Sequence, residues 1–403
     1  MLVSVAIFEN QPYDKVAEHA YRLDNLIRTA ELPADKQLKP LKVFTKPKKD
    51  LLRQIHATTV LRDHPTHSGL QEETIRFVRQ DWADAALHHL WREYMTVQSL
   101  VLDWICAKDL LDHFPADCVN ALCLVITRIP ARYPLQMVDY LAARNAAGQR
   151  KLAAWVLVRL ADVDGLDQIV ADMLDTWAAT GSPNRKATAV MTYALRFSES
   201  DPRKALDQLV SICRSTTSAR VRWTAFHSVL YMLAEASDSR PIVFETLRTW
   251  VQASGRDGKA DGPRIVGLAV GMWVTGFFPN PEKIYVTATD LAENHADDIG
   301  FLAEKVLWDR EYGATALNRL FALANTADYD RSMRSQPNLN PSAEPPADSA
   351  GDELVRILTL ITPDLRWWAR RRKVASLCGR HPTRRKQIRW IFKTARTYQR
   401  RTH

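Results

Sequence analysis

The sequence predicts an all-α protein whose helices stack as a right-handed superhelix, that is, an α-solenoid. Apolar residues recur at helical spacing over residues 51–325. The breaks in this pattern fall at proline-containing turns such as Phe114-Pro115, where a new helix can start and the old one cannot continue. No series of neighbouring segments alternates with period two, so strands are not expected. A self-similar pattern in the middle of the 403-residue chain indicates repeats.

The first 50 residues are expected to hold one helix and a linker. Residues 10–29 place Val16, Ala20 and Leu23 near helical spacing, which is typical of an amphipathic helix. Residues 32–50 are rich in Pro and Lys, a composition that favours a solvated linker or arm. A less regular helical region is expected over 51–145.

The middle of the chain repeats a pair of helices. The segment LDQIV at 166–170 recurs as LDQLV at 206–210. Ala-rich or otherwise apolar helices that open on basic residues start near Arg150, Arg185, Arg220 and Arg264. A helix pair that recurs every ~35–45 residues has the period of an α-solenoid, because two short helices cannot bury a two-sided apolar surface alone.

This pattern over 146–326 resembles HEAT-type repeats. The resemblance implies an all-α, right-handed α-solenoid of HEAT-like helix pairs, followed by a linker at 327–350 and by C-terminal helices with a basic extension at 351–403. Small Ala residues on the first helices would let backbones approach, while Trp and Leu on the second helices, such as Trp177 and Trp250 near their ends, would fill the seam between repeats.

A second resemblance lies upstream of the repeats. Residues 77–94 and 102–104 are similar to helical segments of large actinobacterial proteins, in the region between a STAND-type or AAA-type NTPase domain and HEAT-like repeats. The nucleotide-binding sequence G-x-x-x-x-G-K-[ST] does not occur in this chain, and the Gly-rich stretch 255–262 lacks its spacing. The resemblance therefore implies a repeat-type sensor or adaptor without the NTPase domain.

Charge is segregated along the chain. The chain carries 55 Lys and Arg against 46 Asp and Glu, for a net charge of +9. Fourteen of the basic residues, and no acidic residue, lie in 366–403. A mildly acidic body thus carries a cationic extension, which suggests an anionic partner such as nucleic acid, a membrane surface or an acidic protein.

Aromatic residues are interleaved with the cations of this extension. Arg and Lys would neutralise phosphates while Trp stacks on exposed bases; the same composition suits an interfacial helix on anionic lipid, or a cap on the solenoid with a solvated charged face. The candidate residues for binding nucleic acid or another anionic partner are Arg366, Trp367, Trp368, Arg370, Arg371, Arg372, Lys373, Arg384, Arg385, Lys386, Arg389, Trp390, Lys393 and Arg396.

The sequence offers little for catalysis or metal binding. Asp63, His64 and His67 could supply ligands from a loop, but no further ligand stands at a recognised offset, so a turn in which Asp63 caps the next helix is favoured. Cys118 and Cys123 are five residues apart, so in a helix they point to different faces. No catalytic residue, metal or cofactor is predicted.

The function expected from these observations is that of a non-catalytic scaffold or sensor, which binds a macromolecular partner, most simply a protein, through a helical-repeat surface. The odd count of five cysteines and the lack of an apolar run of membrane-spanning length favour the cytoplasm. The alternatives left open are a HEAT-like protein that binds nucleic acid through its basic tail, and an enzyme with an unrecognised site. Candidate groove residues on second helices are Asp167, Asp172, Asp207, Arg214 and Arg248.

Overall fold

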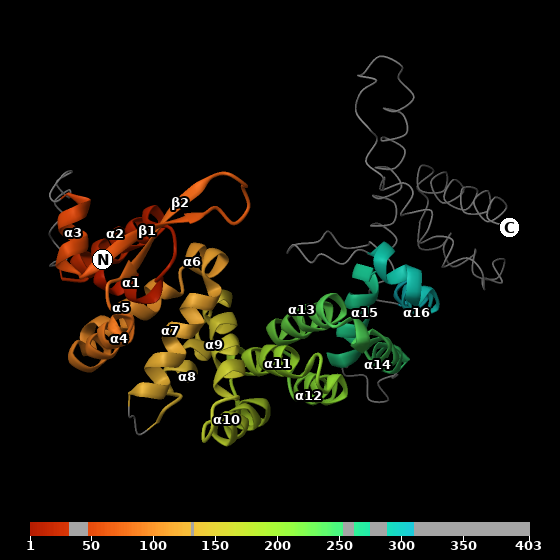
Figure 1. Ribbon diagram of the computed structural model, residues 1–403. Coiled ribbons are helices and arrows are strands. Elements are labelled where there is room, and N and C mark those ends of the chain that lie inside the picture. The colour runs from red at the N-terminus through yellow and green to blue at the C-terminus, as the bar shows by residue number, and fades with distance from the viewer. Residues whose placement is uncertain (32–46, 130–132, 253–261, 275–287, 310–403) are drawn as a thin grey trace, which may run out of the picture. The chain divides into compact units, whose positions relative to one another are not determined.

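The computed structural model describes residues 1–31, 47–129, 133–252, 262–274 and 288–309. These residues are mostly helical, with one two-stranded sheet, so the prediction of an all-α class is confirmed (Figure 1). Within these ranges, every helix is too short or too polar to cross a bilayer. The chain divides into two compact units, Met1–Thr192 and Tyr193–His403.

The first unit holds eleven helices and the sheet among its described residues, the last helix crossing into the second unit. Their bounds are α1 (Leu2–Ile7), α2 (Tyr13–Ala30), α3 (Lys48–Gln54), β1 (Ala57–Asp63), β2 (Gln71–Phe77), α4 (Trp82–Glu93), α5 (Met95–Ile105), α6 (Lys108–His113), α7 (Pro115–Arg128), α8 (Gln136–Ala143), α9 (Ala147–Leu160), α10 (Asp167–Thr180) and α11 (Pro183–Phe197). The helix expected over 10–29 is therefore confirmed as α2. Residues 32–46 of the linker expected over 32–50 lie outside the described residues, and α3 begins at Lys48, inside the range given to that linker.

The short helix α1 lies in the core of the first unit. Val5, Ile7 and Phe8 are buried, and α1 packs on α2, α4, α7 and β2. The ring of Phe8 meets Trp104 of α5 edge to face, with the ring centroids 5.7 Å apart. Because Phe8 and Trp104 are both almost fully buried, this aromatic contact joins residues from distant parts of the sequence in one apolar core.

A β-hairpin interrupts the region that was expected to be helical throughout. Strands β1 and β2 pair antiparallel, from Ala57 opposite Phe77 to Asp63 opposite Gln71. The prediction of helices over 51–145 is wrong for 57–77, and Asp63 ends a strand instead of capping a helix. The alternating pattern is weak in the sequence because only the base of the hairpin is buried, so the distal residues carry no apolar period.

The carboxylate of Asp139 joins three helices of the first unit. Its Oδ1 accepts from Trp177 Nε1 at 3.1 Å and from Arg185 Nε at 2.8 Å. Its Oδ2 accepts from Arg185 Nη2 at 2.7 Å. Since Asp139 lies in α8, Trp177 in α10 and Arg185 in α11, one side chain with both oxygens bonded holds these three helices together.

A second set of polar contacts closes the C-terminal end of α8. Buried Arg150 of α9 donates from Nη1 to the carbonyls of Arg144 (3.0 Å) and Asn145 (2.6 Å). Asn184 of α11 donates from Nδ2 to the carbonyl of Ala143 at 2.7 Å. These carbonyls have no partner inside α8, so the two side chains satisfy groups that burial would otherwise penalise.

The second unit, described from 193 to 309 with gaps, is built from helices that each pack on several neighbours. Their bounds are α12 (Pro202–Arg214), α13 (Ala219–Glu235), the 3₁₀ turn η1 (Ser237–Ser239), α14 (Arg240–Gln252), α15 (Gly262–Val274) and α16 (Ala288–Trp308). Helix α12 packs on α13, α14 and α15, while α15 packs on α13, α14 and α16. Asp201 caps α12 by accepting from the backbone N–H of Lys204 at 3.0 Å, and Pro202 starts the helix.

Two glycines let α15 approach its neighbours closely. A Cβ at Gly267 would stand 2.7 Å from Val251 Cγ2 of α14, and one at Gly271 would stand 2.9 Å from Val306 Cγ2 of α16. The expectation named Ala for such contacts, whereas in α15 the close approaches are made at two glycines four residues apart on one face.

The helix pairs begin where the sequence pattern placed them. Helices α9, α11, α13 and α15 contain the four basic-rich starts, and α10, α12, α14 and α16 follow them. Trp177 and Trp250 are buried, as expected for residues that fill a seam. The division between the two units falls inside α11.

Replacing Asp139 with Ala should lower the free energy of unfolding of the first unit by about 1–3 kcal/mol, because Trp177 and Arg185 lose a charged acceptor. Chemical denaturation followed by circular dichroism measures the change. Asp164→Ala removes an exposed carboxylate between α9 and α10 and should cost much less. An equal loss in both variants would contradict the role assigned to Asp139.

Candidate functional site

Second helices in each of the two units carry exposed charges that are the first candidates for binding. Asp167 and Asp172 are exposed on α10, and Asp207 and Arg214 are exposed on α12. Asp172 Oδ1 accepts from Gln168 Nε2 at 2.7 Å, a bond between side chains of the same helix. These side chains are therefore accessible, as binding of a partner requires.

Arg248 differs from the other candidates on second helices. Its Nε lies 2.7 Å from Asp298 Oδ1, and its guanidinium lies over the ring of Phe301, 5.0 Å from the ring centroid. Both partners are in α16. The side chain of Arg248 thus ties α14 to α16, and its charge faces a carboxylate of the same unit.

The basic residues that open the first helices have structural roles that the sequence did not reveal. Arg150 bonds the end of α8, Arg185 pairs with Asp139, and Arg264 pairs with Asp309. In each case the guanidinium reaches a backbone or carboxylate oxygen on a different segment. The recurrence of these residues at the helix starts was visible in the sequence. The partners of Arg185 and Arg264 were not, because they lie more than 40 residues away along the chain.

The cationic extension lies outside the described residues. This applies to every candidate from Arg366 to Arg396, and also to the Gly-rich stretch 255–261 and the linker 327–350. The binding expected of the extension remains a prediction.

The loop considered as a metal site is the turn of the β-hairpin. His64 Nδ1 is 3.3 Å from the backbone nitrogen of Thr66, which donates to it, and the rings of His64 and His67 have centroids 4.8 Å apart. In the part of the chain that the structure describes, no group of three or more His, Cys, Asp or Glu side chains is placed to hold a metal ion. The hydrogen bond to Thr66 instead orders the turn.

The described cysteines sit in surroundings that disfavour the thiolate. Burial raises the pKa of Cys106 and of Cys118 to about 12. Cys118 Sγ is 3.9 Å from the carbonyl oxygen of Ile105 and donates to it. Because the thiolate is the reactive form, these two thiols have little nucleophilic character at neutral pH.

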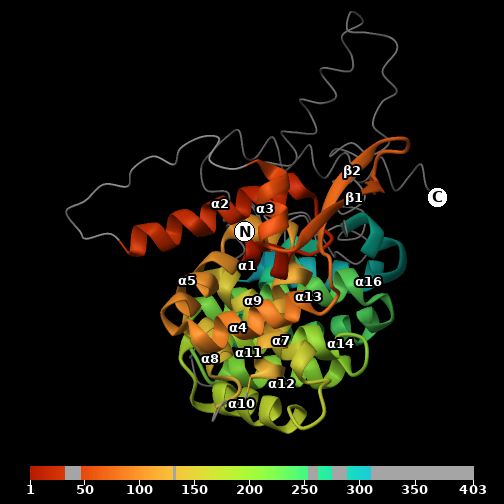
Figure 2. The same ribbon diagram turned by 60° about the vertical axis from the view of Figure 1, so that its left-hand side comes forward.

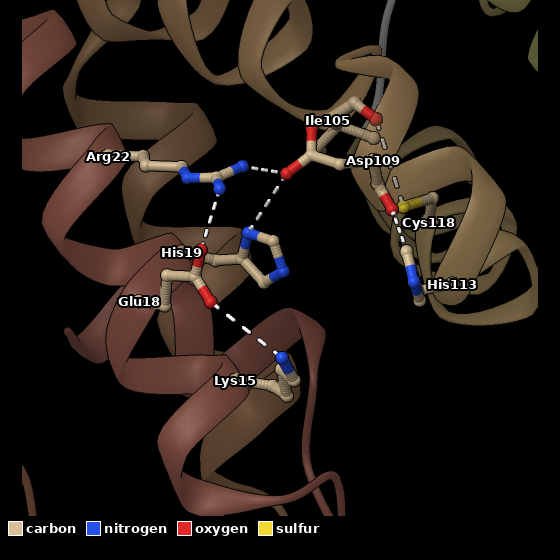
Figure 3. A network of polar contacts seen from close by, with 8 residues as sticks. All are labelled: Lys15, Glu18, His19, Arg22, Ile105, Asp109, His113 and Cys118. Carbon is tan, nitrogen blue, oxygen red and sulfur yellow. Dashed lines mark hydrogen bonds and ion pairs between the residues drawn. The ribbon is translucent and has the colours of Figure 1, made fainter.

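A polar network of titratable groups joins α2 to α6. Figure 3 shows Lys15, Glu18, His19 and Arg22 of α2 turned toward α6. The guanidinium of Arg22 bonds Asp109 of α6, and its Nη2 donates to Glu18 Oε1 at 2.6 Å. Arg22 thus bridges two carboxylates that belong to different helices.

His19 is the buried member of this network. The residue is 5% exposed, and its ring lies 5.9 Å from that of Phe8 and 5.7 Å from that of Phe114, measured between centroids. Its Nδ1 is 3.7 Å from Asp109 Oδ2 (Figure 3), beyond hydrogen-bonding distance. Burial lowers the pKa of His19, and the charge of Arg22 lowers it further. The imidazole is therefore neutral at pH 7.

This network can hold α2 against α6. His113 Nδ1 lies 2.7 Å from the carbonyl oxygen of its own helix residue Asp109. Cys118, the thiol nearest in Figure 3, bonds Ile105 and is protonated at neutral pH. The sequence analysis missed the network because α2 and α6 are separated by more than 70 residues of chain; only the amphipathic pattern of α2 hinted at its buried face.

Comparison with known proteins gave no match: no family model, no curated protein and no solved structure resembles this chain. The residues and contacts described above are therefore the basis for assigning a function.

The stability of the first unit should fall as the pH drops through the unfolded-state pKa of His19, about 6.5. The pKa of His19 is lowered in the folded state, so the unfolded chain binds a proton that the folded chain does not, and the free energy of unfolding decreases until the folded pKa is passed. Urea unfolding at about pH 7.5 and about pH 5.5 measures this difference.

His19→Phe should reduce that pH dependence, because it removes the titrating group and keeps an aromatic ring beside Phe8. His89→Gln, which removes an exposed histidine of α4, serves as the control and should leave the pH dependence as in the native chain. If His19→Phe retains the full pH dependence, another group is responsible.

Proposed function

We propose that the chain is a non-catalytic scaffold or sensor of the cytoplasm that binds a macromolecular partner, most simply a protein, through a helical-repeat surface. In this proposal the helix pairs of 146–326 stack as a right-handed HEAT-like α-solenoid, and the second helices supply the partner-binding surface. The likeness of 77–104 to the segment that precedes HEAT-like repeats in NTPase proteins supports an adaptor role.

The observation that carries the proposal is the division of labour between first and second helices. The basic residues of first helices, such as Arg150 and Arg185, are used in contacts inside the fold. The charges of α10 and α12, such as Asp172 and Asp207, are exposed to solvent. A surface of exposed charge on regularly recurring helices suits recognition by extended shape and charge complementarity.

The packing in the second unit supports a stacked arrangement. Helix α13 packs on α15, α12 packs on α14, and α14 packs on α16, so helices touch their counterparts in the next pair; α13 also packs on its own partner α14, and α15 on α16. Such contacts are expected when each pair covers an apolar face of the next. Within the second unit, Gly267 allows α15 to approach α14 closely, and Gly271 allows it to approach α16 closely.

Charge reversal on α10 tests the binding surface. The double variant Asp167→Lys with Asp172→Lys should weaken capture of the partner from the native cell extract about tenfold or more. The two new lysines would face the cationic groups of the partner that pair with the aspartates in the native complex. Affinity capture followed by mass spectrometry, with titration of the captured protein, measures the loss.

A matched control places the same charge change outside the repeats. Asp84→Lys with Asp112→Lys alters two exposed aspartates on α4 and α6 and should leave capture unchanged. If both double variants bind equally well, or if the native chain captures no stable partner, the proposal fails.

The second candidate function is binding of nucleic acid through the cationic extension. The observation that favours it is the concentration of fourteen Lys and Arg, without a single Asp or Glu, in 366–403, where Trp367, Trp368 and Trp390 supply stacking surfaces. In this alternative the affinity resides in the extension and the repeats serve as its support.

Deleting residues 366–403 should abolish retention on heparin or DNA, together with its steep dependence on salt, because the logarithm of the binding constant falls by roughly 0.9 per phosphate contact for each tenfold rise in salt. Elution from heparin along a salt gradient measures this.

A pair of triple variants tests the same alternative without a deletion. The eluting salt concentration should fall when Gln replaces Arg370, Arg371 and Arg372. It should stay nearly unchanged when Gln replaces Lys36, Lys39 and Lys42. Retention that survives the deletion would discard this alternative.

A further inference from the structure

The β-hairpin of the first unit projects beyond the helices that bury its base (Figures 1 and 2). At the base, Ala57, Ile75 and Phe77 are buried. Toward the turn, Leu61 is 65% exposed. Alternating residues of a strand share one face of the sheet, so Leu61 lies on the same face as Ala57, Ile75 and Phe77. Helices cover this face at the base of the hairpin but leave Leu61 exposed.

One edge of this hairpin is occupied by the chain itself. On the outer side of β2, the N–H of Asn10 donates to the carbonyl of Ile75 (2.7 Å), and the N–H of Ile75 donates to the carbonyl of Gln11 (3.1 Å). Pro12 forms an isolated bridge with Thr74. Residues 10–12 therefore cover β2, and the outer side of β1 is the edge to consider.

The ladder fixes which main-chain groups of β1 point outward. One backbone hydrogen bond lies just beyond each end of the strand pair. The N–H of His64 donates to the carbonyl of Leu70 and the N–H of Val78 donates to the carbonyl of His56, both at 2.9 Å. In an antiparallel pair, residues that bond the partner strand alternate with residues that do not. Thr58, Val60 and Arg62 therefore bond β2, while the N–H and C=O groups of Thr59, Leu61 and Asp63 point away from it.

Over the ranges that the structure describes, no backbone or side-chain group bonds these outward main-chain groups. An unpaired strand edge with an exposed leucine in the middle is a template for a further strand. No proline interrupts β1, and the two charged side chains, Arg62 and Asp63, lie together at its distal end.

We propose that the edge of β1 pairs antiparallel with β1 of a second copy of this chain, with Leu61 opposite Leu61 of the second copy. In this register Thr59 lies opposite Asp63 of the second copy and Val60 lies opposite Arg62, and the two-fold axis generates each pair twice. The two leucines then cover each other on the axis.

Charge selects this register over those nearer the turn. A register shifted by two residues toward the turn would place Arg62 opposite Arg62 of the second copy. A shift of four residues would place Asp63 opposite Asp63 of the second copy. Like charges directly opposite each other are destabilising in a sheet. The charges of β1 therefore exclude the registers nearer the turn and leave the self-pairing centred on Leu61 free of like-charge pairs.

The association is reversible and depends on concentration. Two three-residue edges bury much less surface than the ~1,200 Å² of a typical stable interface. The dimer consequently exchanges with monomer in solution. This inference is independent of the proposed partner surface on α10 and α12, because β1 lies outside the helix pairs.

Sedimentation of the full chain over a range of concentrations tests the self-pairing. The apparent mass should rise from 45.9 kDa toward about twice that value. Leu61→Lys, which brings two ammonium groups together on the axis, should hold the chain at the monomer mass. Leu70→Lys, the same change at a leucine that is 57% exposed beside the turn, should leave the rise as in the native chain, and circular dichroism should show both variants folded.

A disulfide at the axis tests the register. Residues that form a hydrogen-bonded antiparallel pair have Cα atoms about 5.5 Å apart, within the range that a disulfide spans. Leu61→Cys should give a covalent dimer on mild oxidation, at a yield well above those of Leu70→Cys and of the native chain oxidised in parallel.

Two results would overturn the proposal. One is a monomer mass for the native chain at every concentration, which would leave the edge to a strand of another protein. The other is a dimer that persists in Leu61→Lys and gives no Leu61→Cys crosslink, which would place the contact elsewhere on the molecule.

Discussion

The helices between 202 and 274 are short and must bury apolar residues on more than one side, so packing against neighbours is the constraint on which the second unit depends. Helix α13 is 17 residues long and buries nine of them, from Val221 near its start to Leu233 near its end. A helix of this length is marginal in water by itself, since the cost of ordering its backbone exceeds what its own hydrogen bonds return. Its stability therefore comes from α12, α14 and α15, which cover it.

The same constraint explains which parts of the fold the sequence could predict. A helix that buries one or two faces repeats its apolar residues at a fixed spacing, so the starts at Arg150 and Arg185 were visible, as were the proline breaks at Pro115 and Pro202. The β-hairpin was missed because half of it is exposed, and an exposed strand leaves no apolar alternation to detect. Interactions such as Asp139 with Arg185 could not be predicted, because local pattern does not say which distant side chains meet.

Electrostatic pairing inside the described units changes the meaning of the chain's composition. Arg22, Arg185 and Arg264 each face a carboxylate on another segment. Their charges are thus largely neutralised within the fold, whereas Asp167 and Asp172 remain at the surface of α10. A count of basic and acidic residues alone would have missed this difference, because it does not distinguish a charge that joins two helices from one that a partner can reach.

The position of α1 bears on how the first unit is made in the cell. Residues 2–8 are completed on the ribosome well before α4 and α7, the helices against which they are buried. Until residue 128 has emerged, the native surface that buries Val5, Ile7 and Phe8 is incomplete, because α7 has still to join α2, β2 and α4. Nascent chains of this protein would therefore expose an apolar segment throughout early translation, which is the kind of segment that cotranslational chaperones bind.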